Sequence, residues 1–375
     1  MADSSAPTVL ANDFKRQWRD IRDDAITAVD RVGESGWLVL GDEVRSFEEE
    51  LAGWWGLPHV VGVASGLDAL EIGLRCAGIG AGDRVLTTPL TAFATTLAIV
   101  RAGAEPVWCD VDESGGLDLD QARSALEEDP TIRAILPVHL YGHPLDLAAW
   151  RQLVADHDVV LIEDCAQSAG AERDGMPTGA VGLAAATSFY PTKNLGALGD
   201  GGALLTSETE VAERARTLRD YGQKGRYVHR ELGLNSRLDE LHAAILRSAL
   251  LPRLDKYLQR RLDIAARYEQ ALADTSLRPI APTGGSSAHH LFAVEVRDGD
   301  AAEVGERLRD EGVQGGRHYP FVCPDQEAVK GIGVTRGELQ RARRLADREL
   351  SLPIHPYLED AEVEAVVAAC RKVCG

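Results

Sequence analysis

Short apolar runs alternate with amphipathic segments along the first two-thirds of the chain. A run of four or five apolar residues is typical of a buried strand, and apolar residues every three or four positions predict a helix. The expected strands are 60–64, 84–88, 106–109, 134–138, 159–162, 184–187 and 203–206, with helices ending near 77, 102, 127 and 155 between them. Strands that are apolar throughout and alternate with helices predict an α/β fold with a mostly parallel sheet covered on both faces.

The pattern differs on either side of this region. Residues 13–55 have helical periodicity, interrupted by the apolar patch 36–41 between glycines. This patch could be core or the wall of a pocket, and its spacing favours core. The last strand is followed by a helix (210–221), a basic loop (223–230), a helical region opening at Asn235 or Ser236 as N-cap and running to 272, a loop (279–287) and a strand (291–296) among helices. A chain of 375 residues favours two domains, which we place at 1–250 and 251–375, the second a smaller α/β domain.

Composition narrows the class of protein. Hydrophobic residues make up 45% and charged residues 26% of the chain, as in globular proteins. A net charge of −19 argues against a nucleic-acid partner, because phosphate neutralisation needs a basic face. No run approaches the roughly 18 apolar residues of a membrane span, and residues 1–10 lack the pattern of a signal peptide. The six cysteines are scattered without partners at zinc-site spacing, so we expect reduced thiols, no metal and a cytoplasmic location.

Polar residues gather where three of the expected strands end, at 91–93, at Glu163-Asp164 and at 188–193. Ligands of open parallel sheets bind at the carboxyl ends of the strands. Asp164 directly follows four apolar residues, and a carboxylate emerging there is costly unless a cation pairs with it. It is therefore either a helix cap or salt-bridged acid, or the partner of a protonated ring nitrogen in a cofactor.

Lys193 lies in the connection between two apolar runs. Burial among apolar groups lowers the pKa of a lysine and makes a neutral, nucleophilic amine available near neutral pH, as a Schiff-base lysine requires. The alternative is a surface lysine that snorkels from a loop to solvent. A second ligand signal is Ser65-Gly66, where a strand turns into a helix. The free N–H groups at such a helix start bind anions, phosphate in particular, although Ser65 could serve only as an N-cap.

Several motifs resemble those of the DegT/StrS family of nucleotide-sugar aminotransferases, which are pyridoxal-phosphate (PLP) enzymes of fold type I. The resemblance runs from about residue 13 to 358. The matching motifs are Ser188-Phe189-Tyr190-Pro191-Thr192-Lys193-Asn194-Leu195-Gly196 with Gly199-Asp200-Gly201-Gly202, Glu163-Asp164-Cys165-Ala166-Gln167, Gly36-Trp37 to Val44, Val138 to Gly142, Asn235 to Glu240, His318-Tyr319-Pro320 and Ser351-Leu352-Pro353.

The resemblance implies roles at the matching positions. Lys193 would hold PLP as a Schiff base and later move a proton, and Asp164 would keep the ring nitrogen protonated. The other implied cofactor contacts are Ser65, Gly66, Leu67, Phe93 stacked on the ring, Gln167 at the ring hydroxyl, Ser188 at the phosphate and Asn235 from a second subunit; the implied substrate contacts are Trp37, Tyr190, His318 and Tyr319. Many members have Thr or Ser where this chain has Leu67, so here a backbone N–H would replace a hydroxyl.

The implied reaction is a ping-pong transamination by a homodimer with shared sites. L-glutamate would load the cofactor as pyridoxamine phosphate (PMP), and a nucleotide-activated keto-sugar would take the amino group. Residues 189–194 and 224–237 look most like members that aminate C3 of dTDP-3-keto-6-deoxyhexoses in antibiotic pathways; C4 aminotransferases and cyclitol-ketone aminotransferases are alternatives. A deoxygenating branch has histidine at the lysine position, which Lys193 argues against. The intact Lys193, Asp164 and Gln167 also argue against a non-catalytic, PLP-binding regulatory protein on the same scaffold.

Overall fold

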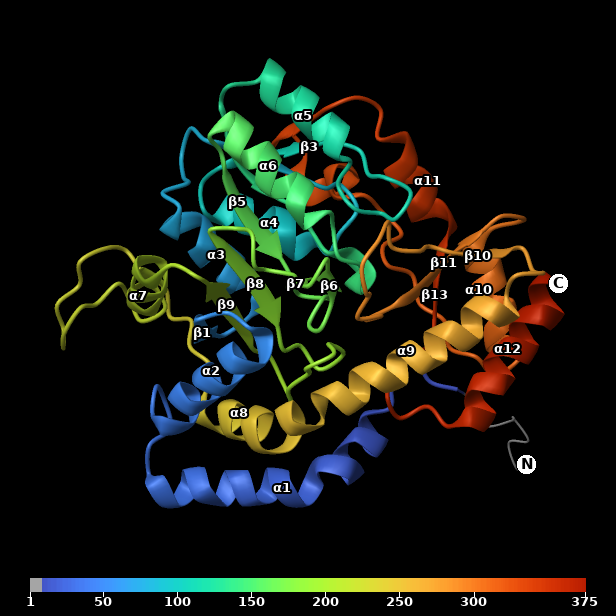
Figure 1. The fold of residues 1–375 in the computed structure, drawn as a ribbon, viewed down its shortest axis with the longest axis horizontal. Helices are drawn as coiled ribbons and strands as arrows, with labels where there is room; N and C mark the ends of the chain where they lie inside the picture. Colours follow the sequence, from blue (N-terminus) through green and yellow to red (C-terminus); the bar gives the residue numbers. More distant parts are fainter. Residues whose placement is uncertain (1–8) are drawn as a thin grey trace.

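The computed structural model describes residues 9–375 and is built around an eight-stranded sheet (Figure 1). Its strands, in the order in which they pair, are β1 (His59–Val63), β9 (Gly202–Thr206), β8 (Ala184–Ser188), β5 (Val160–Asp164), β4 (Ile132–Leu136), β2 (Arg84–Thr87), β3 (Glu105–Trp108) and β12 (Val334–Thr335). Strand β9 pairs antiparallel with β1 and β8, whereas the other neighbours pair parallel. The prediction of an α/β fold with a mostly parallel sheet is confirmed.

Helices cover both faces of this sheet. Along β9, Leu204 packs into one layer while Ala203 and Leu205 pack into the other, because successive side chains of a strand point to opposite faces. One layer contains α3 (Gly66–Cys76), α4 (Phe93–Arg101) and α7 (Thr209–Leu218). The other contains α1 (Phe14–Ser35), α2 (Asp42–Trp55), α5 (Leu119–Glu128), α6 (Leu147–His157) and α8 (Glu240–Ile245).

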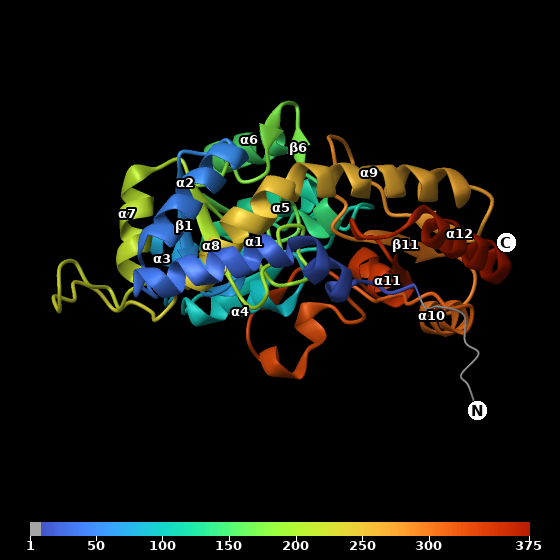
Figure 2. The ribbon, with the colours of Figure 1, turned by 90° about the horizontal axis from the view of Figure 1, so that it is seen from below.

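A second core forms around a small antiparallel sheet near the C-terminus. Its strands are β10 (Leu277–Pro279), β11 (Phe292–Val296) and β13 (Glu349–Leu352), packed with α10 (Ala301–Asp310) and α12 (Asp360–Cys374). Helix α9 (Leu254–Ala271) connects the two parts of the molecule, as both ribbon views show (Figures 1 and 2). Its Leu254 and Tyr257 pack in the large core, whereas Ile264 and Tyr268 pack in the small one. The predicted boundary at residue 250 stays a prediction.

The small core is not confined to the C-terminal segment. Val9 packs into it and pairs with Val313. In the opposite direction, β12 leaves the C-terminal segment to extend the large sheet beside β3, and α11 (Gln340–Arg348) follows it. These exchanges tie the two parts together at their edges.

Two local predictions are wrong. The patch 36–41 is not core, since Trp37 is 62% and Leu38 58% exposed; Trp37 lines a cavity instead, in agreement with the alternative of a pocket wall. The segment runs along the start of α8, where the Glu240 N–H donates to the Leu38 carbonyl. The helix expected to open at Asn235 begins only at Glu240, because Asn235 pairs as extended chain with Asp220. From Glu240 the chain stays helical through a π-helical stretch (246–250) and a 3-10 turn (251–253) into α9, as expected.

Glu240 caps another helix, α2, whereas its neighbours Asn235 and Ser236 were predicted to cap the helix that contains Glu240. Its carboxylate accepts hydrogen bonds from the backbone N–H groups of Gly41, Glu43 and Val44, which are the free donors at the start of α2. A carboxylate at a helix N-terminus satisfies these donors and is favoured by the helix dipole. The start of α8 therefore fixes the position of α2.

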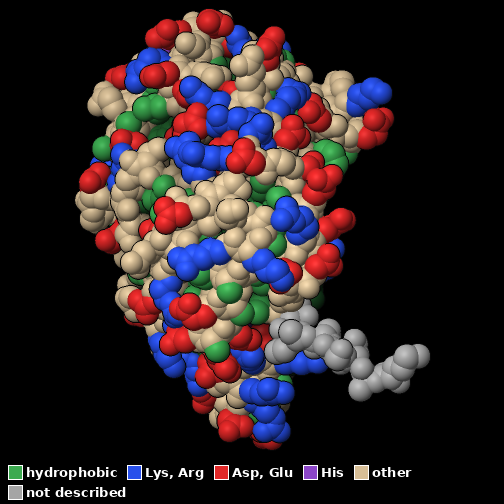
Figure 3. Space-filling model, turned by 90° about the vertical axis from the view of Figure 1, so that its right-hand side faces the viewer, with side chains coloured by type: hydrophobic (Ala, Val, Ile, Leu, Met, Phe, Trp, Pro, Cys, Tyr) green, Lys and Arg blue, Asp and Glu red, His purple; other side chains and the backbone are tan. Residues whose placement is uncertain are grey.

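The surface is charged and mixed. Acidic and basic side chains are interspersed over the face seen from the right of Figure 1 (Figure 3). Over residues 9–375, no helix has both the length and the apolar character needed to cross a bilayer. The connection between α7 and α8 projects from the body of the molecule (Figures 1 and 2) and exposes Tyr227 (75%) and Leu232 (90%).

Candidate active site

The polar clusters predicted at the strand ends lie at one edge of the sheet. Asp164 and Ser188 end the adjacent parallel strands β5 and β8, and Lys193 follows in the loop between β8 and β9. Helix α4 begins with Phe93 after β2 and brings its first turn to the same edge, where the Thr95 hydroxyl donates to Asp164. Parallel pairing thus gathers residues that are far apart in the sequence.

Lys193 is held in a turn and its amine is enclosed. Its backbone N–H donates to the Tyr190 carbonyl at 2.8 Å. Burial lowers the pKa of the Lys193 amine to about 8, and the charge of Asp164 partly opposes this shift. The lowered pKa favours the Schiff-base interpretation over a snorkelling lysine, because a large share of such an amine is neutral and nucleophilic near pH 8.

Asp164 is a buried carboxylate without an ion-pair partner among residues 9–375. Its Oδ2 accepts from the Thr95 hydroxyl at 2.9 Å and its Oδ1 from the Ala166 N–H at 3.0 Å. Burial raises the pKa of Asp164, and these hydrogen bonds and Lys193 act against that rise. Since a buried carboxylate is stabilised by a cation, the site fits a ligand that brings a protonated nitrogen to this position.

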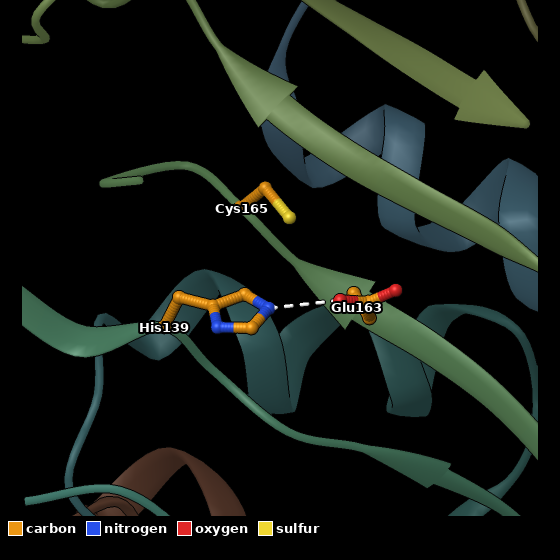
Figure 4. Close-up of side chains that lie close together, drawn as sticks. All are labelled: His139, Glu163 and Cys165. Carbon is orange, nitrogen blue, oxygen red and sulfur yellow. Dashed lines mark hydrogen bonds and ion pairs between the residues drawn. The ribbon is translucent and has the colours of Figure 1, made fainter. Parts of the chain in front are cut away.

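Glu163 points away from Asp164, because neighbouring residues of β5 face opposite sides of the sheet. It forms a buried cluster with His139 and Cys165 that has the composition of a metal site (Figure 4). Glu163 Oε2 binds His139 Nε2 at 2.9 Å, and both Glu163 oxygens also accept backbone N–H groups from Gly179, Val181 and Gly182. The Leu145 N–H donates to His139 Nδ1, so Nε2 carries the proton. These donors and acceptors satisfy one another, which is typical of a structural network.

A close approach of backbones forms the predicted anion site. Strand β1 ends at Val63, two residues before Ser65, whose hydroxyl caps α3 by accepting the Asp68 N–H, as the N-cap alternative predicted. The N–H groups of Gly66 and Leu67 in the first helical turn have no intrahelical acceptor. A Cβ on Gly66 would meet the Ser188 Cβ at 2.9 Å, and a Cβ on Gly202 would meet the Ser65 carbonyl carbon at 2.3 Å. The glycines therefore bring the Ser188 hydroxyl beside the helix N-terminus, an arrangement suited to a phosphate.

Gln167, Tyr319 and His318 also meet at this edge. Gln167 Oε1 accepts the Tyr141 N–H at 2.6 Å, and its Nε2 donates to the Tyr319 hydroxyl at 3.2 Å. Tyr141 in turn donates its hydroxyl to the His318 carbonyl at 2.9 Å. The network joins β5 to the C-terminal part of the chain and leaves the second Gln167 N–H free for a ligand.

The remaining predicted contacts are less closely associated with Lys193. Tyr190 is 52% exposed and donates its N–H to the Ser188 hydroxyl, and Phe93 packs against Trp108. Trp37 lines a separate cavity of about 610 Å³ with Arg31, Arg45 and Glu240. Asn235 is exposed on the returning arm of the projecting connection.

The residue that follows Asn235 lies beside the anion cradle of its own subunit. The chain doubles back: the Ser236 hydroxyl accepts the Ala64 N–H at 3.1 Å and donates to the Asp68 carboxylate at 2.7 Å, beside the start of α3 in the same subunit. The projecting connection thus leaves the sheet edge and returns to it.

Sequence reasoning missed Thr95, Ser236 and Glu349 as functional neighbours of the site. The first two are described above; Glu349 accepts the His318 N–H at 2.5 Å. Each contacts an element distant in the chain, so local patterns carry no signal for Thr95 or Glu349. Ser236 lies in a motif that the sequence did single out.

The site thus combines a buried lysine, a buried carboxylate without a cation and a glycine-lined anion cradle at the edge of a parallel sheet. This combination defines an α/β transferase site that fits PLP: the lysine for its aldehyde, the carboxylate for its ring nitrogen and the cradle for its phosphate.

Comparison with known proteins agrees with this assignment. Residues 19–371 match the model of the DegT/DnrJ/EryC1/StrS aminotransferase family, and the chain belongs to that family. The dTDP-3-amino-3,4,6-trideoxy-alpha-D-glucose transaminase of Streptomyces venezuelae is 40% identical over 98% of this chain and 97% of its own. The erythromycin biosynthesis sensory transduction protein EryC1 of Saccharopolyspora erythraea is 42% identical over 96% and 98%.

Solved structures of relatives share the whole fold. S. venezuelae DesV, determined in complex with a ketimine intermediate, superposes with a TM-score of 0.93 at 40% identity and covers 98% of each chain. NtdA from Bacillus subtilis, determined with bound PMP, gives a TM-score of 0.89 at 26% identity and covers 100% of this chain and 86% of its own. The chain is therefore an aminotransferase of the PLP-dependent class.

Proposed function

We propose that this protein transfers the amino group of L-glutamate to C3 of a dTDP-3-keto-6-deoxyhexose in the biosynthesis of a deoxyamino sugar. The observation that carries the transamination is the enclosed Lys193 amine, with its lowered pKa, beside the unpaired Asp164 carboxylate. The sugar substrate is supported by the S. venezuelae relative, which is a dTDP-3-amino-3,4,6-trideoxy-alpha-D-glucose transaminase. C4 keto-sugars and cyclitol ketones are the competing acceptors.

The residues divide the work as follows. PLP supplies an aldehyde that condenses with amines and a ring that accepts electrons. Lys193 holds the cofactor and, once released, moves a proton at the substrate carbon, for which an amine with a pKa near 8 is well matched. Asp164, supported by Thr95, holds the ring-nitrogen proton. Gly66, Leu67 and Ser188 bind the phosphate.

Gln167 and its partners would hold the ring hydroxyl of the cofactor. Gln167 contacts the ring hydroxyl with its free N–H, Tyr319 supports Gln167, and Phe93 stacks on the ring. His318, Tyr190 and Trp37 contact the substrate. Nitrogen passes from glutamate, which leaves as 2-oxoglutarate, to the keto carbon of the sugar, whose oxygen leaves as water.

A homodimer with shared sites is part of the proposal. Large apolar side chains are exposed on α1, on segment 36–41 and on the projecting connection. A second subunit would cover these side chains. A cytoplasmic location fits the six cysteines, which are all free.

Half-reactions test the proposal. L-glutamate alone should abolish the PLP absorbance and release one 2-oxoglutarate per site, and a dTDP-3-keto-6-deoxyhexose should restore it with formation of an amino sugar. A panel that includes 4-keto sugars and cyclitol ketones identifies the acceptor, and Lys193→Ala is the inactive control. A protein that keeps its absorbance in glutamate would instead be a PLP-binding regulator.

A further inference from the structure

His318 is held by a buried chain of hydrogen bonds that the catalytic assignments do not use. Segment 313–319 runs antiparallel beside β13, with Gly316 paired to Ser351 through two backbone hydrogen bonds. In β13, Leu350 and Leu352 pack into the small core, so Glu349 and Ser351 face the other side, toward His318. The absence of a side chain on Gly316 makes room for the His318 ring, since a Cβ there would meet its Cε1 at 3.0 Å.

These hydrogen bonds link Glu349 to Ser351 and Ser351 to the His318 ring, and we call this set of contacts the relay. Ser351 Oγ lies 2.9 Å from His318 Nδ1 and donates its proton to Glu349 Oε1 at 2.5 Å. The second carboxylate oxygen, Oε2, accepts the His318 backbone N–H at 2.5 Å. Glu349 is fully buried and Ser351 is 4% exposed, so solvent does not compete for these bonds.

The directions of the bonds fix the position of the imidazole proton. A serine hydroxyl that donates to a carboxylate has only lone pairs left for other partners, so His318 must donate its Nδ1–H to Ser351. Burial, with the nearby Lys193 amine, lowers the pKa of His318 to about 4, so the ring is neutral at pH 7. A neutral ring protonated at Nδ1 has a lone pair at Nε2. His318 lines the cavity of about 70 Å³ together with Thr192, the neighbour of Lys193.

We propose that Glu349 and Ser351 are positioning residues that hold His318 as the Nδ1–H tautomer, so that Nε2 accepts a hydrogen bond from a hydroxyl group of the keto substrate. The lone pair of His318 Nε2 can only accept a hydrogen bond. A carboxylate has no proton to donate to it, whereas the hydroxyl groups of a sugar can donate. The choice of ligand rests on the proposed function; the tautomer does not.

Glu349→Gln gives a sharp test of the tautomer. The His318 backbone N–H can only donate, so the Gln oxygen must remain opposite it and the new NH₂ must face Ser351 Oγ. Ser351 would then donate to His318 Nδ1, and the ring proton would move to Nε2. Nitrogen NMR of the holoenzyme with labelled histidine, at pH 8, should show the Nδ1–H form in the wild type and the Nε2–H form in Glu349→Gln. The His318→Asn variant assigns the signal.

Two further variants and a control keep the test independent of folding. Ser351→Ala should leave a mixture of tautomers, and Ser351→Thr, which keeps the hydroxyl, should restore the Nδ1–H form. Glu295→Gln is the matched control, because Glu295 is another buried acid, opposite Glu349 on β11, with Arg344 as its partner. It should leave His318 unchanged. The relay would be overturned if the wild-type ring carried its proton at Nε2, or if the His318 tautomer were the same in Glu349→Gln as in the wild type.

Titration of the wild type gives a second readout. Burial raises the pKa of Glu349 to about 7. Below that pH the neutral acid would donate to Ser351, and the wild-type ring should adopt the Nε2–H form that Glu349→Gln has at every pH. The other charged or titratable groups that act on Glu349 or His318 are Arg317, Tyr141, Tyr319, Lys193 and His290. A ring that changes in the opposite direction, to the Nδ1–H form as the pH falls, would contradict the relay.

Kinetics test the ligand separately. Glu349→Gln should raise the KM of the keto substrate by about tenfold or more, because the Nε2–H of His318 would then face the substrate hydroxyl, with a donor on each side. The rate of the glutamate half-reaction should stay within about twofold of the wild type. An inverted tautomer with an unchanged KM would refute the substrate contact but keep the relay. Loss of the glutamate reaction in the wild type would refute the proposed function and leave the tautomer result standing.

Discussion

At the scale of single residues, the chemistry depends on two charges that burial makes costly. Lys193 and Asp164 each lie where solvation is poor, which favours a neutral amine and a protonated acid, and each partly offsets the shift of the other. The apolar runs before each residue were enough to predict both positions. Thr95, which donates to Asp164, could not be predicted, because the contact joins α4 to β5 across 69 residues.

We expect the Lys193 amine to react with aldehydes at a lower pH than ordinary lysines. Its pKa is lowered to about 8, so the neutral, reactive form gains ground as pH rises through about 8, whereas an exposed lysine needs a pH near 10.4. Reductive methylation of the apoprotein over a pH series, followed by peptide mass spectrometry, measures each lysine. The exposed Lys15 and Lys256 are internal controls.

Asp164→Asn determines the sign of the coupling. The negative charge of Asp164 raises the pKa of Lys193, so its removal should move the Lys193 midpoint below that of the wild type and leave Lys15 and Lys256 unchanged. A Lys193 midpoint that coincides with those of the exposed lysines would show that the amine is not desolvated.

At the scale of elements, the sequence was a better guide to which segments are strands and helices than to which of these segments are buried by others. The patch 36–41 is apolar, but apolar character alone cannot distinguish a core segment from an exposed apolar surface. Asn235 and Ser236 have the residue types of an N-cap, yet helix α8 begins later, and the Ser236 hydroxyl binds near the start of α3. Capping preference is local, whereas these contacts depend on the tertiary structure.

Gly202→Ala should damage the anion cradle. A Cβ at residue 202 would lie 2.3 Å from the Ser65 carbonyl carbon and 2.5 Å from the Gly66 nitrogen, so the start of α3 must shift away from Ser188. We expect a loss of about 1–3 kcal/mol in the free energy of unfolding of the apoprotein and about tenfold or more weaker PLP binding. Urea denaturation and a PLP titration measure the two effects.

Gly53→Ala is the matched control. Gly53 lies exposed within α2, where an added Cβ meets nothing within 4 Å, and alanine favours a helix over glycine by about 1 kcal/mol or less. This variant should be slightly more stable and bind PLP normally. Equal behaviour of the two alanine variants would mean that the close approach at Gly202 is unimportant.

At the scale of the whole molecule, the fold class followed from the alternation of strands and helices, but the strand order did not. The antiparallel direction of β9, the addition of β12 from residue 334 and the packing of Val9 in the small core all depend on contacts distant in the sequence. The exposed apolar side chains of α1 and of the projecting connection belong to the same scale, because contacts within residues 9–375 leave them uncovered.

The last prediction is that each active site draws on two chains, with Asn235 completing the site of the partner subunit. Asn235 is exposed, beside a connection that projects from the body and exposes large apolar side chains. Lys193→Ala and Asn235→Asp should each be inactive, the second because its carboxylate repels the phosphate. After subunit exchange, hybrid dimers would have one site with both changes and one with neither, so about half of the hybrid sites should regain turnover.

The reciprocal mixture separates this model from sites complete within single chains. The double variant Lys193→Ala/Asn235→Asp is mixed with wild type, and exchange is verified with a mass tag. If Asn235 serves the partner's site, each hybrid site carries one change and the hybrids are inactive. If Asn235 serves its own chain, as the return of Ser236 to α3 would allow, the wild-type site of each hybrid stays active while the first mixture regains nothing. The two mixtures give opposite results under the two models, so the pair of measurements decides which chain Asn235 serves.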